Sequence, residues 1–459
     1  MYFEQFYLGC LAHASYMFGS QGEAVVVDPQ RDVEIYLEAA QKHGLEIRHI
    51  FETHLHADFV SGHKELAART GATIYIGKAA GATFPHVPMS DGFELRAGKV
   101  KIKALETPGH TPESCCLVIT DEEKSQQPWA VLTGDTLFIG DVGRPDLSPA
   151  HTPQQLAGMM HDSLHRKLMA LPNEVLVYPA HGAGSLCGRN MRAERSSTIG
   201  TERLTNCALQ IKDRDEFIRQ MTSNLPARPD YFLEDAAINR TGATPLTELP
   251  ELKPIPAAEL KAMLDRGAIA LDVRPTDQFA AGHVPGSVNI ALSGQFASWA
   301  GAVLGLAARP VLIAETPDQL AEARMRLARV GIEDLSGYLE GGIEGWKRAG
   351  FDLAQMPQMT VQELGTDDRV WQVLDVRRQG EWEAGHMPGA DWYPLDRFKA
   401  ALPPLRKAIV AVHCKSGYRS MIAASLLKRA GHDVINVIGG FDAWEKEHLP
   451  VVSSAAVSV

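Results

Sequence analysis

The sequence predicts a multidomain protein of mixed α/β and α+β class, with one larger domain followed by two smaller α/β domains. Three observations lead to this prediction. The chain has 459 residues, whereas ordinary domains hold about 100–200. Its second half contains the same unit twice. Short β-branched runs alternate with helical patterns, which is typical of sheets covered by helices.

Composition restricts the class of partner. The net charge of −11 provides no basic surface for nucleic acid or anionic lipid, so we expect small-molecule chemistry. No apolar run approaches the ~20 residues that span a bilayer, and the start "MYFEQFYLGC" lacks the features of a secretion signal. The six cysteines are too few for a disulfide framework. Reduced thiols, and therefore a cytoplasmic location, are expected.

The repeat sets the domain boundaries. "LDVRPTDQFAAGHVPGSVNI" begins at Leu271, and "LDVRRQGEWEAGHMPGADWY" begins at Leu374. A stretch with prolines at 245, 250, 254 and 256 precedes the first unit and is typical of a linker, and "DLAQMPQMT" precedes the second. We therefore predict a first domain over 1–240, a second over 254–352 and a third over 357–452.

The strands and helices follow in chain order. In the first domain the strand candidates are 23–29, 47–54, 72–77, 100–108, 115–120, 129–135 and 174–181. In the repeats, apolar runs alternate with helical patterns over 318–331 and 420–431. That alternation predicts a parallel sheet covered by helices in each repeat.

Four strand ends of the first domain carry metal-ligand chemistry. They are "THLHAD" over 53–58, "TPGHT" with His110, "LTGDT" with Asp135, and "YPAHG" with His181. Imidazole and carboxylate are the usual ligands of zinc or iron. Any one of these residues alone would be read as a cap or a buried polar group. The ordered set favours a metal site.

At these residues the first domain resembles the metallo-β-lactamase superfamily, which implies an αββα sandwich. Dinuclear members carry His-x-His-x-Asp-His, but Phe59 stands at the last position here and cannot coordinate a metal. The resemblance then points to the persulfide dioxygenases, which need one metal. It implies a single Fe(II) per chain, held by His54, His110 and Asp135. Two histidines and one carboxylate leave positions open for substrate and O2.

Further residues of this domain are assigned supporting roles. The resemblance implies that His56, Asp58 and His181 orient the ligands or the persulfide. The segment "GDVGRPDL", which contains Arg144, also resembles the dioxygenase branch. Cys187 lies six residues past His181 and is either a sulfur relay or a buried small residue; both interpretations stay open. Zinc in a hydrolase of the glyoxalase II kind is the alternative metal chemistry.

The third domain contains a strand, a tight loop and a helix over 409–431. Cys414 ends the strand, Gly417 permits an unusual backbone angle, and Ser420 is expected to cap the helix. Such a loop directs N–H groups toward an anionic sulfur, and Arg419 adds positive charge. The predicted persulfide loop comprises Lys415, Ser416, Gly417, Tyr418 and Ser420. The alternative is that Cys414 is a buried, unreactive cysteine with a structural role only.

This pattern resembles the rhodanese sulfurtransferases, across both repeats. The resemblance implies that Cys414 carries sulfane sulfur and that Arg419 assists it. Protein-tyrosine phosphatases also place a cysteine and an arginine in such a loop, but with five residues between them, whereas four separate Cys414 from Arg419 here. Residues 208–413 contain no cysteine, so the first repeat is expected to be inactive and structural.

Together the two resemblances imply a persulfide dioxygenase–sulfurtransferase fusion in sulfide detoxification. A thiol persulfide of glutathione, coenzyme A or a similar carrier would react with O2 to give sulfite. Cys414 would transfer sulfane sulfur, forming or using thiosulfate. A homo-oligomer is expected, with no nucleic-acid or membrane partner. The alternatives are a zinc thioester hydrolase with a sulfurtransferase tail, and a non-enzymatic sulfur carrier.

Overall fold

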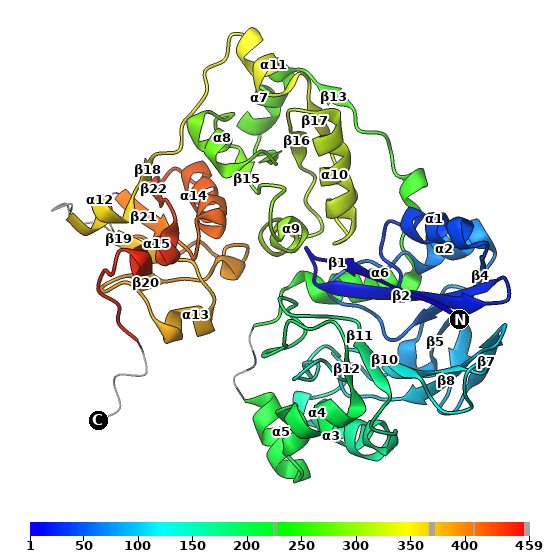
Figure 1. Ribbon diagram of the computed structural model, residues 1–459. Helices are drawn as coiled ribbons and strands as arrows, with labels where there is room; N and C mark the ends of the chain where they lie inside the picture. Colours follow the sequence, from blue (N-terminus) through cyan, green and yellow to red (C-terminus); the bar gives the residue numbers. More distant parts are fainter. Residues whose placement is uncertain (224, 226, 367–371, 407–408, 454–459) are drawn as a thin grey trace, which may run out of the picture. The chain divides into compact units, whose positions relative to one another are not determined.

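The computed structural model describes residues 1–223, 225, 227–366, 372–406 and 409–453 (Figure 1). It divides into two compact units. The first comprises Met1–Leu249 with the short segment Ala328–Gly331, and the second comprises Pro250–Leu327 and Ile332–Val459. The predicted domain over 357–452 includes 367–371 and 407–408, which lie outside the described residues.

The first unit is built on two six-stranded sheets. One has the order β1 (Tyr2–Leu8), β2 (His13–Ser20), β3 (Glu23–Val27), β4 (Glu46–Glu52), β5 (Thr73–Gly77) and β6 (Val87–Met89). The other has the order β12 (Ser197–Thr198), β11 (Leu176–Pro179), β10 (Ala130–Gly134), β9 (Cys115–Asp121), β8 (Val100–Glu106) and β7 (Glu94–Ala97). The seven strands predicted for this domain correspond to β3, β4, β5, β8, β9, β10 and β11.

The two sheets pack face to face. Phe18 and Phe51 of the first sheet meet Ile102 and Leu117 of the second in one buried cluster. Each fully buried apolar side chain of this kind contributes about 1.5–3 kcal/mol. Helices cover both outer faces, which confirms the predicted αββα sandwich (Figure 1). They are α1 (Glu34–His43) and α2 (His63–Thr70) on one side, and α3 (Pro153–Arg166) and α5 (Arg214–Thr222) on the other.

The second unit contains two five-stranded sheets with the same plan. The first has the order β13 (Pro254–Ile255), β17 (Gly337–Leu339), β16 (Val311–Ile313), β14 (Ala270–Asp272) and β15 (Val288–Asn289). The second has the order β18 (Gln358–Met359), β22 (Asp433–Val437), β21 (Ile409–His413), β19 (Gln372–Asp375) and β20 (Asp391–Trp392). Neighbouring strands are parallel in both, as predicted.

Helices connect these parallel strands, as parallel pairing requires. The first repeat contains α7 (Ala257–Asp265), α8 (Thr276–Ala281), α9 (Phe296–Leu304), α10 (Pro317–Ala328) and α11 (Gly342–Arg348). The second contains α12 (Val361–Thr366), α13 (Gln379–Ala384), α14 (Tyr418–Arg429) and α15 (Gly440–Lys446). Two further helices, α4 (Ile199–Thr205) and α6 (Tyr231–Thr241), belong to the first unit.

The repeated "LDVR" motif is a buried ion pair at the same place in each repeat. Arg274 Nη2 lies 2.7 Å from Asp272 Oδ2, and Arg377 Nη2 lies 2.7 Å from Asp375 Oδ2. Each arginine also donates to a backbone carbonyl eight residues further along the chain. Because a buried charge needs a partner, the Asp and Arg recur together.

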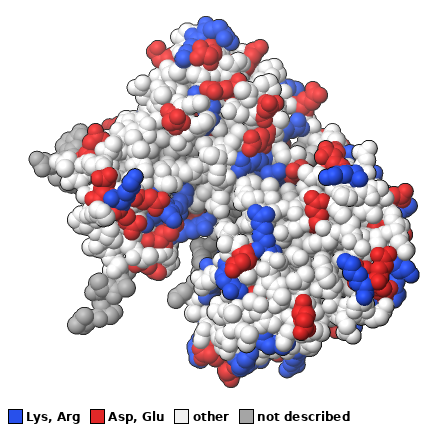
Figure 2. All heavy atoms as spheres, in the orientation of Figure 1, with Lys and Arg blue, Asp and Glu red and all other residues white. Residues whose placement is uncertain are grey.

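The surface carries both signs of charge. Figure 2 shows Lys and Arg side chains interspersed with Asp and Glu on the displayed face. Among the helices of the described residues, none is long and apolar enough to cross a membrane.

Candidate metal centre and thiol loop

His54, His110 and Asp135 meet at the strand ends of the first unit. One ligand atom from each lies within 4.8 Å of the other two, and all three residues are buried. The Asp135 Oδ2 atom lies 3.3 Å from His110 Nε2 and 3.9 Å from His54 Nε2. The structure therefore brings together the three residues that the sequence assigns to the metal.

Hydrogen bonds assign the proton on each of these histidines. The Thr53 hydroxyl donates to Asp28 Oδ2 at 2.8 Å, so it can only accept from His54 Nδ1, 3.0 Å away. The His110 Nδ1–H donates to the Arg144 carbonyl at 2.9 Å. Both Nε2 atoms therefore carry lone pairs, and neither has a hydrogen-bond partner among the described residues. Two buried lone pairs beside a carboxylate suit a metal ion.

The protonation states agree with this assignment. Burial lowers the pKa of His54 and His110, so both are neutral near pH 7. Burial alone would raise the pKa of Asp135, but His181 and the other histidines outweigh it and hold that pKa well below its usual value. Neutral imidazole and ionised carboxylate are the forms that bind metal, and the cluster supports a metal cofactor.

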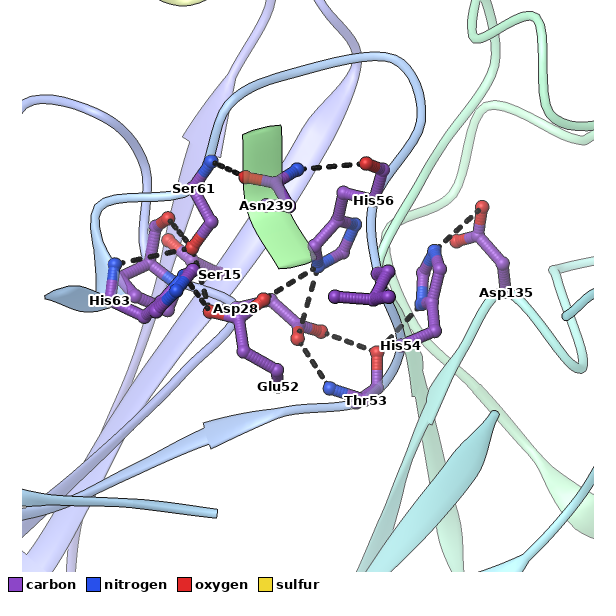
Figure 3. Close-up of polar contacts among 12 residues, drawn as sticks. Ser15, Asp28, Glu52, Thr53, His54, His56, Ser61, His63, Asp135 and Asn239 are labelled. Atoms are coloured by element: carbon purple, nitrogen blue, oxygen red, sulfur yellow. Dashed lines mark hydrogen bonds and ion pairs between the residues drawn. The ribbon is translucent and has the colours of Figure 1, made fainter. Parts of the chain in front are cut away.

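His56 is turned toward two carboxylates. Its Nε2 lies 3.1 Å from Asp28 Oδ1 and 3.6 Å from Glu52 Oε2 (Figure 3). Burial would lower the pKa of His56, but the charges of Asp28 and Glu52 raise it overall. Its ring lies 4.1 Å from the ring of His54. The sequence did not single out Asp28 or Glu52, although Asp28 also ends an apolar strand.

Asp58 and His181 form a second group beside Asp135. His181 Nδ1 lies 2.8 Å from Asp135 Oδ1, and its Nε2 lies 2.9 Å from Asp58 Oδ2. Burial would lower the pKa of His181, but these two carboxylates raise it well above its usual value. Cys187 is near enough to offer its sulfur to the same group, within 4.8 Å. Burial raises the pKa of the Cys187 thiol, which therefore stays protonated there.

Phe59 occupies buried space among histidine rings. Its ring centroid lies 4.4 Å from that of His56 and 4.1 Å from that of His13, the first residue of β2. His13 is fully buried, and neither of its ring nitrogens has a hydrogen-bond partner among the described residues. Burial lowers the pKa of His13, so the ring is neutral. Nothing in the local sequence pattern distinguishes His13.

Helix α6 fixes the loop that carries the histidines. The Asn239 side chain donates to the carbonyls of His56 and Phe59 at 2.8 and 2.7 Å. Its oxygen accepts from the Ser61 N–H at 2.8 Å (Figure 3). One buried amide thus satisfies three backbone groups of the metal loop.

The "GDVGRPDL" segment lies against the ligands. A Cβ atom on Gly143 would lie 2.1 Å from the Asp135 carbonyl oxygen, so only glycine is accommodated. The Arg144 guanidinium pairs with Asp146 at 2.7 and 2.9 Å, and the Arg144 N–H donates to the Cys187 carbonyl at 2.9 Å. Arg144 therefore ties the loop of Cys187 to the loop that supports His110.

The thiol loop lies at the end of β21 in the second unit. Cys414 is buried, and its Sγ accepts the Gly417 N–H at 3.2 Å. Gly417 has a φ of 106°, which favours glycine, and α14 begins at the next residue. Across the loop, a Cβ atom on Gly440 would lie 2.3 Å from the Cys414 carbonyl oxygen. This close approach explains why the "GGFDAW" element accompanies the loop.

The remaining loop residues differ in their roles. The Arg419 guanidinium pairs with Glu381 through two contacts of 2.6 Å. Lys415 and Ser416 are exposed. The expectation that Ser420 caps the helix is wrong, because α14 already begins at Tyr418. Ser420 lies inside the first turn, where its hydroxyl contacts Asn436 Oδ1 at 2.7 Å.

The first repeat has no thiol at the matching place. A Cβ atom on Gly342 would lie 2.6 Å from the Ala314 carbonyl oxygen. This matches the second repeat, where a Cβ atom on Gly440 would lie 2.3 Å from the Cys414 carbonyl oxygen. Ala314 therefore corresponds to Cys414. Glu315 stands where the second repeat has the exposed Lys415.

Two features define the class of this protein. The first domain is an αββα sandwich with a cluster of possible metal ligands at its strand ends. Two domains with parallel sheets follow, and one of them has a thiol loop. The model of the metallo-beta-lactamase superfamily matches residues 8–181, and the model of the rhodanese-like domain matches residues 256–349 and 358–447. The chain belongs to the metallo-β-lactamase superfamily, and rhodanese-like domains follow that domain.

Three individual proteins illustrate what this chain is similar to. The persulfide dioxygenase ETHE1 of Mus musculus is 30% identical over 221 residues, which cover 46% of this chain and 77% of that protein. A hydroxyacylglutathione hydrolase of Rhodospirillum rubrum is 36% identical over 163 residues, 35% of this chain and 57% of that protein. The crystal structure of a metallo-beta-lactamase from Staphylococcus aureus matches with a TM-score of 0.66 and 32% identity, and the match covers 74% of this chain and 98% of that one.

Proposed function

We propose that the chain oxidises a low-molecular-weight thiol persulfide with O2 to sulfite and transfers sulfane sulfur at Cys414. The observation that carries the proposal is the donor set at the first site. The Nε2 atoms of His54 and His110 face Asp135, whereas the His56 Nε2 faces Asp28 in an ion pair at 3.1 Å. This leaves two histidines and one carboxylate, the set typical of iron(II) oxygenases. Similarity to a persulfide dioxygenase supports the same activity.

The overall reaction balances with water as co-reactant. A persulfide RSSH, O2 and H2O give the thiol RSH, sulfite and two protons. The terminal sulfur is oxidised, O2 is reduced, and the S–S bond breaks. Fe(II) bound by His54, His110 and Asp135 would supply sites where the sulfur and O2 can bind next to each other.

The chain's own residues prepare this site. Thr53 and the Arg144 carbonyl fix the tautomers of the two histidines. Asp58 and His181 lie beside Asp135, where the raised pKa of His181 keeps a proton available for the leaving thiolate. Phe59 and His13 are buried, and their rings fill the adjoining space.

At the thiol loop the proposal is a sulfurtransferase. The Cys414 thiolate would take the outer sulfur of a persulfide, releasing the carrier thiol, and pass it to sulfite as thiosulfate. The reverse direction uses thiosulfate as donor. The Gly417 N–H already points at Sγ, and the N-terminal end of α14 favours a negative sulfur.

Metal analysis with oxygen uptake tests the first activity. Protein produced without added metal should contain one iron per chain and consume O2 with glutathione persulfide. His54→Ala should lose both iron and oxygen uptake. His56→Ala should keep iron and lose about 10–100-fold in rate. Two zincs per chain without O2 uptake would contradict the proposal.

The competing function is a zinc thioester hydrolase with a sulfurtransferase tail. Similarity to a hydroxyacylglutathione hydrolase supports it. Against it stands Phe59, which removes a ligand from a second metal. Hydrolysis of S-lactoylglutathione by the zinc-loaded protein at rates above those of O2 uptake would favour it.

The second activity has its own test. Cys414→Ser should abolish sulfur transfer from thiosulfate to cyanide and leave persulfide oxidation largely intact. Residual transfer near the wild-type rate would exclude Cys414 as the sulfur carrier.

A further inference from the structure

Helix α14 carries the thiol loop at its N-terminal end, and one of its faces is bonded to the thiol-free repeat along its whole length. The Tyr418 hydroxyl donates to the Ala291 carbonyl at 2.8 Å. The Ser425 hydroxyl accepts the Asn289 N–H at 3.0 Å. Arg429 donates to three carbonyls of the first repeat, at 2.8, 2.9 and 2.9 Å. Residues seven and four positions apart share one helix face, so this face is a continuous docking surface.

Tyr418 is the anchor nearest to the reactive sulfur. It directly follows Gly417, whose N–H donates to Cys414 Sγ at 3.2 Å. Gly417 adopts a φ of 106°, and Tyr418 is the first residue of α14. The N–H that faces the sulfur lies in the peptide unit between Ser416 and Gly417, so Gly417 alone separates it from Tyr418. Movement of Tyr418 would therefore reach this N–H through the backbone of Gly417.

The surface that receives Tyr418 is itself held in place. Arg326 of α10, the helix that corresponds to α14 in the first repeat, donates to the carbonyls of Leu292 and Gly294, the latter at 2.8 Å. Arg326 is buried. The Tyr418 ring packs on Gly294, where a Cβ atom would lie 3.5 Å from the ring. Burial raises the pKa of Tyr418, so its hydroxyl remains a donor at neutral pH.

We propose that Tyr418 is a positioning residue for Cys414, and that the thiol-free repeat acts through it to hold the sulfur-binding loop in its reactive geometry. The inference rests on the proposed sulfur transfer at Cys414. It gives the first repeat a defined task, although Ala314 has replaced its own reactive residue. The loop would be preorganised by a neighbouring domain rather than by its own domain alone.

Tyr418→Phe in the full chain tests the proposal, because it keeps the ring and removes only the hydroxyl. A hydrogen bond of this kind contributes about 0.5–1.5 kcal/mol, which corresponds to about threefold to tenfold. The pH midpoint for alkylation of Cys414, followed on its peptide by mass spectrometry, should rise by about 0.5–1 unit. The kcat of transfer from thiosulfate to cyanide should fall by about threefold to tenfold with KM for thiosulfate nearly unchanged.

Arg429→Met is the matched control. It removes bonds from the same helix to the same repeat, but at the end away from the sulfur. It should lower the melting temperature and leave the alkylation midpoint and kcat as in the wild type. An equal change of midpoint in Arg429→Met would overturn the proposal, because docking in general would then be responsible. A wild-type midpoint and kcat in Tyr418→Phe would also overturn it.

Arg326→Lys provides a second route if Tyr418→Phe does not fold. Lysine keeps the charge but cannot hold both carbonyls in the arginine geometry, so the midpoint should again rise, and an unchanged midpoint would overturn the proposal. Alkylation needs no turnover and is therefore independent of the proposed function. Absence of sulfur transfer in the wild type would contradict that function, whereas an active wild type with an indifferent Tyr418 contradicts only this inference.

Discussion

At the scale of single residues, the state of His54 depends on one hydroxyl. The Thr53 hydroxyl donates to Asp28 and accepts from His54 Nδ1. Without this hydroxyl, nothing would keep the proton of His54 on Nδ1 and the lone pair of Nε2 facing Asp135. We expect Thr53→Val, which preserves shape, to reduce metal affinity about 10–100-fold, as the loss of such supporting bonds commonly does. Competition for the metal with a chromophoric chelator measures the change.

Thr120→Val is the control for that experiment. Thr120 is a buried threonine of β9, away from the ligand cluster. The Thr120→Val variant should bind metal with the affinity of the wild type. Equal affinities in Thr53→Val and the wild type would show that the His54 tautomer is fixed in another way.

A second residue-scale prediction concerns the charge near Cys414. The Arg419 guanidinium is paired with Glu381, which offsets its effect on the sulfur. Burial would raise the pKa of Glu381, but the bonds from Arg419 lower it overall, so Glu381 is ionised at neutral pH. Glu381→Gln removes this negative charge, and alkylation of Cys414 should then reach its midpoint about 0.5 pH unit lower.

The opposite substitution checks the sign. Arg419→Gln should move the midpoint upward. If both variants move it in the same direction, the effect comes from disruption of the loop rather than from charge.

The sequence pattern points to the residues of the candidate metal site more fully than to the residues around it. His54, His110, Asp135 and His181 each follow an apolar strand, a signal that can be read without a structure. Asp28, which directly follows β3, carries the same signal. Glu52 ends β4 and contacts His56 only four residues further along the chain. His13 and Asn239 lack such a signal, because their roles come from contacts between segments far apart in the chain.

At the scale of elements, helix α6 is the brace of the metal loop. Asn239 satisfies two carbonyls and one N–H of that loop. Asn239→Leu leaves these buried groups without partners at about 1–3 kcal/mol each. We expect a loss of about 3 kcal/mol in stability of the first domain and weaker metal retention.

Two measurements test this prediction: the thermal unfolding of the protein and the rate at which it releases its metal. Thr241→Ala, an exposed change on the same helix, is the control and should behave as the wild type. Unchanged unfolding of Asn239→Leu would indicate that the loop is held by its strands alone.

Strands and helices were predicted more reliably than their ends. Apolar runs gave the strands of both units, because burial imposes that pattern. The sequence predicts Ser420 as the cap of α14, whereas the positive φ of Gly417 lets the helix begin at Tyr418. The close approach of Gly440 to the Cys414 carbonyl is likewise a contact between distant segments, which only the structure reveals.

At the scale of the whole molecule, the two proposed reactions would share an intermediate on one chain. Sulfite would leave the first site and would be an acceptor at Cys414. The sequence predicts a semi-rigid, Pro-rich linker over 241–256. In the structure the first unit extends to Leu249 and β13 begins at Pro254, so only 250–253 remain as the connection. Tethering of two sites raises the local concentration of one site's product at the other to the order of mM.

This arrangement predicts that the intact chain couples the two reactions. Given persulfide and O2, the wild type should release more thiosulfate and less sulfite than Cys414→Ser. An equimolar mixture of His54→Ala and Cys414→Ser contains one working copy of each site on separate, full-length chains. At nanomolar protein the mixture should release sulfite almost as Cys414→Ser does, because the product is diluted before it meets a second chain. Chromatography of thiosulfate and sulfite over time measures both.

Two outcomes would decide against this direction of sulfur flow. If the mixture matched the wild type at every protein concentration, the sites would exchange product through solution and the tether would be irrelevant. If Cys414→Ser and the wild type gave the same ratio, the thiol loop would not act on sulfite from the metal site. Thiosulfate would then be the donor, and O2 uptake from thiosulfate plus thiol should appear in the wild type and vanish in Cys414→Ser.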